Sequence, residues 1–373
     1  MDSPERIAVV GAGAVGLTTA FDLAARGARV TLFERDDPGA GMTGRAAGIC
    51  YDAYAEDVDV AVADRAMQRF REFDGKGEFV FHETPYVFLA REGDDASATA
   101  LSEAVERMQV HNRAAELITP DELADRFPIR TDDVALAGVS ETAGWADPSA
   151  YVDLLVEQCE TEGVEFRVGE EVSIRTDPPR VVTVDSVVRF DAVVVAAGVH
   201  SRALLADAGH PLALKPYRVQ ALVAECDYDG PTVYDATDES YLRPHPTGVF
   251  AGDGVEPVAA DPSDWDSSAD EWFVEESTAA VRHRTETDPR VERAWAGLCG
   301  ATPDRNPLVG AIAEGVSVAA GWHGHGFMWA PALGEMLAAD VLGDDGPIPE
   351  SFDPRRFDGD EEFAVVDGMT LDE

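Results

Sequence analysis

A glycine-rich turn near the N-terminus constrains the fold more than any other feature of this sequence. Gly11, Gly13 and Gly16 follow the apolar run 7–10 and open an Ala-rich stretch that reaches residue 26. This pattern predicts a β-strand, a tight turn and an α-helix. Glycines at this spacing let the backbone approach a pyrophosphate, and the start of the helix presents free N–H groups to its negative charge. The turn therefore predicts a dinucleotide site on a Rossmann-like α/β domain.

The segment after this helix supplies the second part of the predicted site. A predicted strand over 29–33 ends at Glu34, whose carboxylate can accept hydrogen bonds from ribose hydroxyls. Arg35 offers an alternative, the binding of a 2′-phosphate as in an NADP enzyme. The residues expected at the cofactor from this part of the chain are Gly11, Gly13, Ala14, Val15, Gly16, Glu34 and Arg35.

A second stretch, 39–44, has the same spacing of glycines. It follows Pro38 in a turn and has no strand before it, so we reject it as a second dinucleotide turn. The sequence thus predicts one tightly bound dinucleotide and no separate NAD site.

Acidic residues outnumber basic ones so strongly that several classes of partner are excluded. The 373 residues include 72 Asp and Glu against 29 Lys and Arg, a formal charge of −43. Such a surface repels the phosphates of nucleic acids and anionic lipid headgroups. Hydrophobic residues make up 45% of the chain, which favours a packed core over disorder. We therefore expect a folded protein that binds neither nucleic acid nor a membrane.

Lysine is almost absent, since Lys76 and Lys215 are the only two in the sequence. An acidic, lysine-poor surface suits a cytoplasm of molar salt, where charges are screened within about 3 Å, so we expect a halophilic source. The alternative is an acidic mesophilic protein. The sequence contains neither a run of 18 apolar residues nor a signal-peptide pattern, which predicts a cytoplasmic protein. The four cysteines lie far apart, so we expect reduced thiols and no metal site.

Four further segments resemble the D-amino-acid oxidase superfamily of FAD-dependent amine oxidoreductases, which includes glycine oxidase, sarcosine oxidase and the D-amino-acid dehydrogenases. They are 43–49, 190–198, 297–310 and 321–331, and the resemblance spans roughly residues 5–357. It implies an α/β fold in which a glutathione-reductase-like FAD-binding domain carries an inserted substrate domain on a mixed, largely antiparallel sheet. The cysteine that holds flavin covalently in sarcosine oxidase falls on Gly297, which implies non-covalent FAD.

The resemblance also assigns residues to the flavin. Small residues of the loop 43–49 let the backbone touch the cofactor. A glycine-rich turn at 321–326 opens a helix and aims N–H groups at the flavin edge where negative charge develops on reduction. The residues that the resemblance implies are Thr43, Arg45, Ala46, Ala47, Gly48, Ile49, Ala197, Gly198, Gly324, His325, Gly326, Phe327 and Met328.

The substrate-binding positions depart from the family pattern. The carboxylate-binding Arg of glycine oxidases falls on Cys299, and the corresponding Lys of sarcosine oxidases falls on Met328. The planar fork of arginine suits a carboxylate, so another arginine is expected to take this role. For each candidate arginine, a purely structural ion pair is an equally good interpretation. For His325, the equally good alternative is a packed turn residue without a chemical role. The candidate catalytic or substrate-binding residues are Arg218, Tyr241, Arg243 and His325, with Arg45 as a further possible anchor.

The position of the residue that activates the electron acceptor also departs from the family pattern. The lysine that sarcosine oxidases place near the flavin to activate oxygen falls on Phe250, and only Lys215 is left to replace it from another strand. We therefore slightly favour a dehydrogenase that passes electrons to a quinone or an electron carrier, although a positive arginine would also support oxygen chemistry.

The family order predicts how the chain divides into domains. The FAD-binding domain is expected over 1–80, 145–215 and 295–357, and the substrate domain over 81–144 and 216–294. Residues 358–373 are expected to form a solvated acidic tail.

Together these features predict an FAD-dependent oxidoreductase that oxidises the C–N bond of a small amino acid, such as a D-amino acid, or of a secondary amine, by hydride transfer to flavin N5. One alternative is a 2-hydroxy-acid dehydrogenase on the same fold. A second is a non-catalytic FAD-binding subunit, and a third, based on Arg35, is an NAD(P) dehydrogenase.

Overall fold

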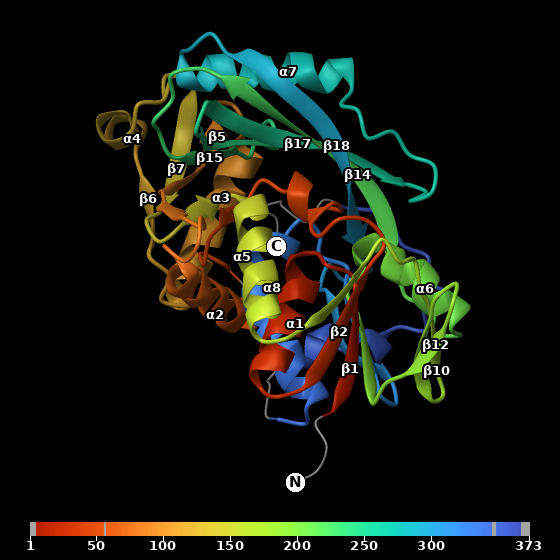
Figure 1. Cartoon of the computed structure of the whole chain (residues 1–373). Helices are drawn as coiled ribbons and strands as arrows, with labels where there is room; N and C mark the ends of the chain where they lie inside the picture. Colours follow the sequence, from red (N-terminus) through yellow and green to blue (C-terminus); the bar gives the residue numbers. More distant parts are fainter. Residues whose placement is uncertain (1–4, 56, 345–347, 367–373) are drawn as a thin grey trace.

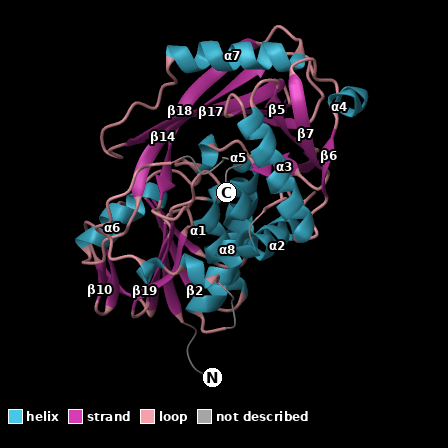
Figure 2. Ribbon diagram, turned by 180° about the vertical axis from the view of Figure 1, so that it is seen from behind, coloured by secondary structure: helices cyan, strands magenta, loops and turns pink. Residues whose placement is uncertain are grey.

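The computed structural model describes residues 5–55, 57–344 and 348–366 of the chain (Figure 1). Two large β-sheets form its frame. Helix α7 (Glu271–Thr285) covers the outer face of one of them, as Figures 1 and 2 show from opposite sides.

The first sheet is built around the N-terminal strand. Its six strands lie in the order β19 (Leu308–Ala313), β20 (Val316–Ala320), β13 (Ala192–Val195), β1 (Arg6–Val10), β2 (Arg29–Glu34) and β9 (Glu165–Val168). All neighbours run parallel except β19 and β20. Four of the five β1 residues are buried, because a parallel sheet is covered on both faces.

Helices cover one face of this sheet and a small meander covers the other. The helices are α1 (Ala14–Ala25), α2 (Asp57–Phe73), α5 (Pro148–Thr161) and α8 (Gly326–Val341), and they share one hydrophobic core with β1 and β2. The opposite face packs against β10 (Ser173–Thr176), β11 (Pro179–Val182), β12 (Val187–Arg189) and α6 (Ser201–Asp207). This six-stranded sheet, which we call the nucleotide-type sheet, is therefore the middle one of three layers.

The second large sheet is mixed. Its order is β18 (Arg290–Ala301), β14 (Lys215–Glu225), β17 (Gly248–Ala259), β16 (Ser240–His245), β15 (Thr232–Asp235), β5 (Tyr86–Arg91), β7 (Val134–Ser140) and β6 (Ala115–Ile118). Only the pair β15 and β5 is parallel. Helices α3 (Asp95–Val110) and α4 (Pro120–Arg126) pack near β5, β6 and β7.

A short three-stranded sheet joins the loop 43–49 to more distant parts of the chain. It consists of β3 (Ile49–Cys50), β8 (Gly144–Ala146) and β4 (Phe81–Glu83), with β8 in the middle. Ile49 pairs with Trp145, and His82 pairs with Trp145 from the other side. This pairing places Trp145 next to the loop predicted to touch the flavin.

The predicted fold class is confirmed, because a largely parallel nucleotide-type sheet is combined with a mixed, mostly antiparallel one. β18 runs through the predicted boundary at residue 295 and pairs with β14 along its whole length. None of the helices in the described part of the chain combines the length and apolar character needed to cross a lipid bilayer.

The expectation of a solvated tail is wrong for the residues of the tail that the structure describes. Phe363 and Val365 pack against Tyr217, Cys299 and Ala301 at one end of the eight-stranded sheet. Their apolar side chains explain this, since charge on the neighbouring residues does not prevent an extended segment from burying one side. Residues 367–373 lie outside the described residues.

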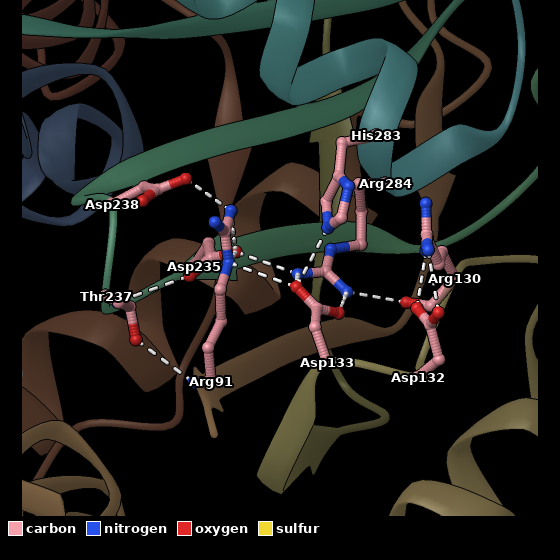
Figure 3. A network of polar contacts seen from close by, with 9 residues as sticks. All are labelled: Arg91, Arg130, Asp132, Asp133, Asp235, Thr237, Asp238, His283 and Arg284. Atoms are coloured by element: carbon pink, nitrogen blue, oxygen red, sulfur yellow. Dashed lines mark hydrogen bonds and ion pairs between the residues drawn. The ribbon is translucent and has the colours of Figure 1, made fainter. Parts of the chain in front are cut away.

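A buried network of ion pairs fastens α7 to the second sheet (Figure 3). Arg284 donates from Nη1 to Asp133 Oδ1 at 2.9 Å and from Nη2 to Asp235 Oδ2 at 2.9 Å. His283 Nε2 lies 2.8 Å from Asp133 Oδ2, and Arg91 Nε donates to Asp235 at 2.8 Å. Burial opposes ionisation of Asp133, but hydrogen bonds from His283 and Arg284 outweigh it and hold the pKa of this carboxyl below its usual range.

We expect Asp133→Asn to lower the free energy of unfolding by about 3 kcal/mol, because it leaves the buried charge of Arg284 with fewer partners. The matched control is Asp132→Asn, whose ion pair with Arg130 is exposed and should contribute far less to stability than the contacts of Asp133. Urea unfolding at pH 6 measures both.

The effect of Asp133→Asn should also depend on pH. A carboxyl with a depressed pKa stabilises the fold above its unfolded pKa of about 4, and this stability is lost as the pH falls through the folded value. The difference between the parent and Asp133→Asn should therefore be full at pH 6 and shrink below about pH 4. A difference that stays constant down to pH 2 would contradict this assignment.

Candidate functional site

The predicted dinucleotide turn lies where β1 meets α1. Gly11 has φ +108°, and a Cβ placed on it would lie 2.4 Å from the carbonyl oxygen of Ala196, so only glycine fits. α1 begins at Ala14 and carries no acidic residue in its first turn. No carboxylate of the helix's own first turn competes for its N–H groups, so the positive end of α1 is suited to an anion.

Glu34 is held at the end of β2, beside this turn. Its Oε2 accepts a hydrogen bond from the Ala12 amide at 2.7 Å, and its Oε1 accepts one from the Asp36 amide at 2.9 Å. Both bonds fix the carboxylate next to the start of α1. Arg35 turns away to an exposed ion pair with Asp36, at 3.0 Å.

The loop 43–49 touches the glycine turn and then runs toward the second sheet. Thr43 Oγ1 accepts a hydrogen bond from the Ala14 amide at 3.0 Å. Gly48 has φ +72°, and a Cβ there would lie 2.0 Å from the carbonyl oxygen of Ala146, so glycine is required at this close approach. Ala197 and Gly198 follow β13, next to the close contact made by Gly11.

The turn that opens α8 carries His325 as the residue before the helix. The imidazole ring stacks on Trp329 with centroids 5.0 Å apart, and Nε2 lies 3.4 Å from Tyr51 Oη. Burial lowers the pKa of His325 to about 3. His325 is therefore neutral at physiological pH and can only offer or accept a hydrogen bond.

Phe327 and Met328, the second and third residues of α8, make different contacts. The Phe327 side chain packs in the helical core, 5.5 Å from the Phe70 ring and 5.6 Å from the Tyr151 ring. Met328 Sδ accepts a hydrogen bond from Tyr54 Oη at 2.7 Å. Any contact of Phe327 with a cofactor is therefore limited to its backbone.

These elements fit a dinucleotide. The glycine turn and the first amides of a 12-residue helix suit a pyrophosphate, and the Glu34 carboxylate is fixed beside them for ribose hydroxyls. The loop at 43–49 and the turn before α8 supply small residues and backbone. The donor set therefore matches the cofactor that the sequence predicts.

The inner face of the eight-stranded sheet is defined by alternation along β14. Ala221 and Val223 pack in one cluster with Phe250 and Ala47, so their side faces the loop 43–49. Leu222 and Ala224 belong to the cluster under α7. Successive side chains of a strand point to opposite faces, and residues that pair across neighbouring strands point to the same face. The pairing of β14 with β17, and of β17 with β16, therefore assigns the faces of those strands as well.

Arg243 lies on this inner face and is 3% exposed. Its guanidinium carbon lies 4.4 Å from the centre of the Trp145 ring and 4.8 Å from that of Phe250. Nε donates to the carbonyl oxygen of Ala47, and Nη1 donates to that of Pro244. Among the residues that the structure describes, no carboxylate forms an ion pair with Arg243. Burial lowers its pKa to about 10, which still leaves it protonated at neutral pH.

Tyr241 lies two residues before Arg243 on the same face. Its ring stacks parallel to Phe250 with centroids 6.3 Å apart and lies over Gly252, where an added Cβ would be 2.2 Å from Tyr241 Oη. Tyr51 packs in a cluster with Ala47 and Tyr241. Because Tyr51 also approaches His325, this cluster connects the two ends of the candidate site.

Arg218 does not join this group. It lies on the outer face, where its guanidinium bonds to Glu256 and Asp270 and to backbone carbonyl oxygens at 266 and 268. Its charge is matched by these two carboxylates, so the expectation that Arg218 binds substrate is not supported. The physical reason is strand alternation, which places 218 and 222 on one side and 221 and 223 on the other.

Arg45 connects the loop to β18. Its Nη1 donates to the carbonyl oxygen of Ala296 at 2.9 Å, and its own carbonyl oxygen accepts from Trp295 Nε1 at 3.2 Å. The Arg45 side chain therefore points to the second sheet and not to the glycine turn.

Sequence reasoning missed several aromatic residues of the site. Trp145 reaches Arg243 through the pairing of β8 with β3, and nothing near residue 145 signals that contact. Tyr51 and Tyr54 lie shortly after the loop 43–49 in the sequence. A motif extended to residue 54 would have included them.

Comparison with known proteins identifies the family. Residues 6–340 match the family described as "DAO: FAD dependent oxidoreductase". Glycine oxidase of Pseudomonas aeruginosa is 26% identical over 92% of this chain and 96% of its own length. The structure of L-proline dehydrogenase from P. horikoshii has a TM-score of 0.85 and 27% identity, covering 96% of this chain and 98% of that one.

A longer relative matches as well. The 4-methylaminobutanoate oxidase (formaldehyde-forming) of Paenarthrobacter nicotinovorans is 27% identical over 95% of this chain. This chain spans 46% of the length of that oxidase. Because the family match extends over most of the chain, the protein belongs to the DAO family of FAD-dependent oxidoreductases, whose members bind FAD and oxidise amines and amino acids.

Proposed function

We propose that this protein oxidises the C–N bond of a small amino acid or secondary amine, with Arg243 as the anchor for a substrate carboxylate. The observation that carries the proposal is the buried guanidinium of Arg243, which lacks an acidic partner among the described residues and lies beside the loop 43–49. Relatives named glycine oxidase and L-proline dehydrogenase support an amino acid as substrate.

FAD would be held without a covalent bond by the glycine turn, Glu34, the loop 43–49, residues 197–198 and the turn before α8. When bound, FAD supplies the acceptor for the hydride that leaves the substrate carbon, at flavin N5. The remaining C=N bond is hydrolysed by water. The division into an FAD-binding and a substrate domain is likewise our proposal, with β18 assigned to the substrate domain.

Arg243 suits a carboxylate because its planar fork can donate two parallel hydrogen bonds. The guanidinium lies against the aromatic rings of Trp145 and Phe250 and is shielded from water, which strengthens a charge–charge contact. Tyr241 on the same face would add a hydroxyl. Neutral His325 would orient the substrate or flavin through a hydrogen bond and not through its charge.

We slightly favour a dehydrogenase over an oxidase. Phe250 stands where sarcosine oxidases place their oxygen-activating lysine, and Lys215 donates its Nζ hydrogen bond to the carbonyl oxygen of Phe363 at 2.5 Å. Lys215 is thus engaged elsewhere. A quinone or an electron carrier would accept the electrons. Halophilic origin and cytoplasmic location stay predictions from the sequence.

Anaerobic mixing with a panel of ligands in molar salt tests this function. The panel contains D- and L-amino acids, sarcosine, proline and 2-hydroxy acids, and bleaching of the flavin band marks a substrate. We expect an amino acid or secondary amine to bleach it. Bleaching by hydroxy acids alone would establish the 2-hydroxy-acid dehydrogenase instead. Reduction by dithionite but by no member of the panel would support a non-catalytic FAD-binding subunit.

The placement of the ribose beside Glu34 gives a binding prediction. Glu34→Gln should raise the dissociation constant of FAD about tenfold or more, because a hydrogen bond to a charged group contributes ~1.5–3 kcal/mol. Titration of the apoprotein with FAD, followed by flavin fluorescence, measures it. The control is Asp36→Asn, an exposed carboxylate two residues away. Equal dissociation constants for the two variants would count against the site.

The anchor gives a substrate-specific prediction. Arg243→Met should slow flavin reduction by proline or sarcosine about 30-fold, the equivalent of ~2 kcal/mol for a charge-assisted pair. Reduction by pyrrolidine or dimethylamine, which lack the carboxylate, should change less than about threefold. Stopped-flow absorbance measures both, at equal FAD content.

Two further variants make this test specific. Arg282→Met removes an exposed arginine of α7, on the outer side of the sheet, whose ion pair is with Asp288, and it should leave both ligand classes unaffected. Arg243→Lys keeps the charge and should recover part of the lost rate. An equal loss for acids and amines would show that Arg243 only supports the loop at Ala47.

A further inference from the structure

The small meander of β10, β11 and β12 carries a row of three arginines on its outer face. Arg175 pairs across the sheet with Arg180, and Arg180 pairs with Arg189, so the three side chains are neighbours on one face. The opposite face packs on the nucleotide-type sheet through Ile174 and Val181. The arginines therefore point to solvent, and Figures 1 and 2 show β10 at the periphery of the molecule.

These three arginines have no partner among the residues that the structure describes. None of them forms a hydrogen bond, an ion pair or an aromatic contact there. Most other arginines of this acidic chain pair with carboxylates, as Arg218 and Arg284 do. Like charges directly opposite one another destabilise a sheet. The single chain thus carries a local repulsion that a negatively charged partner would relieve.

The same face carries acidic residues at its opposite end. Glu171 lies just before β10 and has the same parity as Arg175, while its neighbour Val172 packs inward. Asp185 lies in the tight turn between β11 and β12. Both acidic residues are exposed, and neither carboxylate has a partner within the described ranges of the chain. The outer face of β10–β12 is therefore basic at one end and acidic at the other.

A row with apolar side chains separates the two ends. It consists of Ser173, Val182 and Val187, which pair with one another across the three strands. Val187 is 57% exposed, and Val184 in the adjacent turn is 97% exposed. Arginine beside exposed apolar area is typical of a protein interface, whereas a small inorganic anion would make no use of the valines.

The charges are arranged symmetrically about this middle row. On β10, Arg175 lies two residues after Ser173, and Glu171 lies two residues before it. On β12, which runs in the same direction as β10, Arg189 and Asp185 stand in the same relation to the row. If two copies meet face to face, a two-fold axis along the row lays the basic end of each copy over the acidic end of the other.

We propose that the outer face of β10–β12 is the contact surface of a symmetric dimer, so that a second copy of this chain occupies it. Arg175 of one copy pairs with Glu171 of the other, and Arg189 pairs with Asp185, and each pair occurs twice. The valines of the two copies meet at the centre. Because three short strands about 4.8 Å apart make a small face, the dimer is weaker than one with a standard interface of about 1,600 Å².

The net charge sets the condition under which this dimer forms. Two chains of charge −43 repel each other over about 10 Å at about 0.1 M salt, but over only about 3 Å in molar salt. Ion pairs that are partly buried at a contact are screened much less than exposed charges. We therefore expect dimers in molar KCl and monomers at about 0.1 M KCl.

The first test exchanges charges across the contact. Sedimentation velocity of the FAD-loaded protein over a concentration series in molar KCl gives the dissociation constant of the dimer. Arg175→Glu and Glu171→Arg should each raise it about tenfold or more, because a paired contact becomes a like-charge contact. The double variant Glu171→Arg with Arg175→Glu exchanges the two charges and should return the constant to within about threefold of the parent. Arg282→Glu, on α7, is the matched control.

Loss of the fold does not explain the expected effect of Arg175→Glu. Within one chain this variant replaces the repulsion between residues 175 and 180 by an attraction, so the monomer should be at least as stable as the parent. Thermal unfolding at about 0.1 M KCl, where we expect monomers, measures that stability.

The second test locates the two-fold axis. Cys226 and Cys299 are the partly exposed thiols of the described chain, so the background is Cys226→Ser with Cys299→Ser. In that background Ser173→Cys lies on the axis, and a short bismaleimide should join two copies into a covalent dimer. Thr99→Cys, at an exposed position of α3, is the matched control and should stay monomeric under the same conditions.

Each other outcome overturns the proposal. A monomer at every concentration in molar KCl does so directly. A dimer that both single variants leave unchanged has its interface elsewhere. Binding of inorganic pyrophosphate by a monomer, with loss of that binding in Arg180→Ser, would assign the row to a small anion instead. None of these measurements depends on turnover, so their failure leaves the proposed function untouched.

Discussion

The position of the second sheet over the nucleotide-type sheet depends on hydrogen bonds between arginines and backbone carbonyl groups around the loop 43–49. Arg243, on β16, donates a hydrogen bond to the carbonyl oxygen of Ala47. Arg45, in the loop, donates one to the carbonyl oxygen of Ala296 on β18. Charged donors to carbonyl oxygens are stronger than neutral ones, and both are partly or fully shielded from water. The loop that touches the dinucleotide turn through Thr43 is therefore the same loop that contacts the eight-stranded sheet and sets its distance from that turn.

Arginine has two different uses in this acidic protein. Arg218, Arg284 and most others are surrounded by carboxylates, which suits a chain with 72 acidic residues. Arg243 is held by aromatic rings and carbonyl oxygens, and no described carboxylate pairs with it. A buried charge without a counter-ion is costly, and this is why we propose Arg243 as the anchor for a ligand of opposite charge.

The nucleotide half of the site is predictable from the sequence because its signals are local. The glycine turn, the helix start and Glu34 lie within 24 residues, and each has a direct steric or electrostatic reason. The substrate half is not local. Arg218 and Arg243 look alike in sequence, and only the register of β14, β16 and β17 shows that they lie on opposite faces. Trp145 joins the site because it pairs with Ile49. These two residues lie far apart in the sequence, and the pattern within either strand does not reveal their pairing.

The net charge of the whole chain and the charge of the buried Arg243 act over different distances. At about 0.1 M salt the field of −43 charges extends about 10 Å from the surface and opposes an approaching anion, whereas molar salt confines that field to about 3 Å. Arg243 is protected from this screening because its neighbours are aromatic and dry. Salt should therefore remove most of the repulsion that an anion meets at the surface and little of its attraction to the buried Arg243. If Arg243 anchors a carboxylate as we propose, its binding should gain from salt, the opposite of what an exposed basic patch would show.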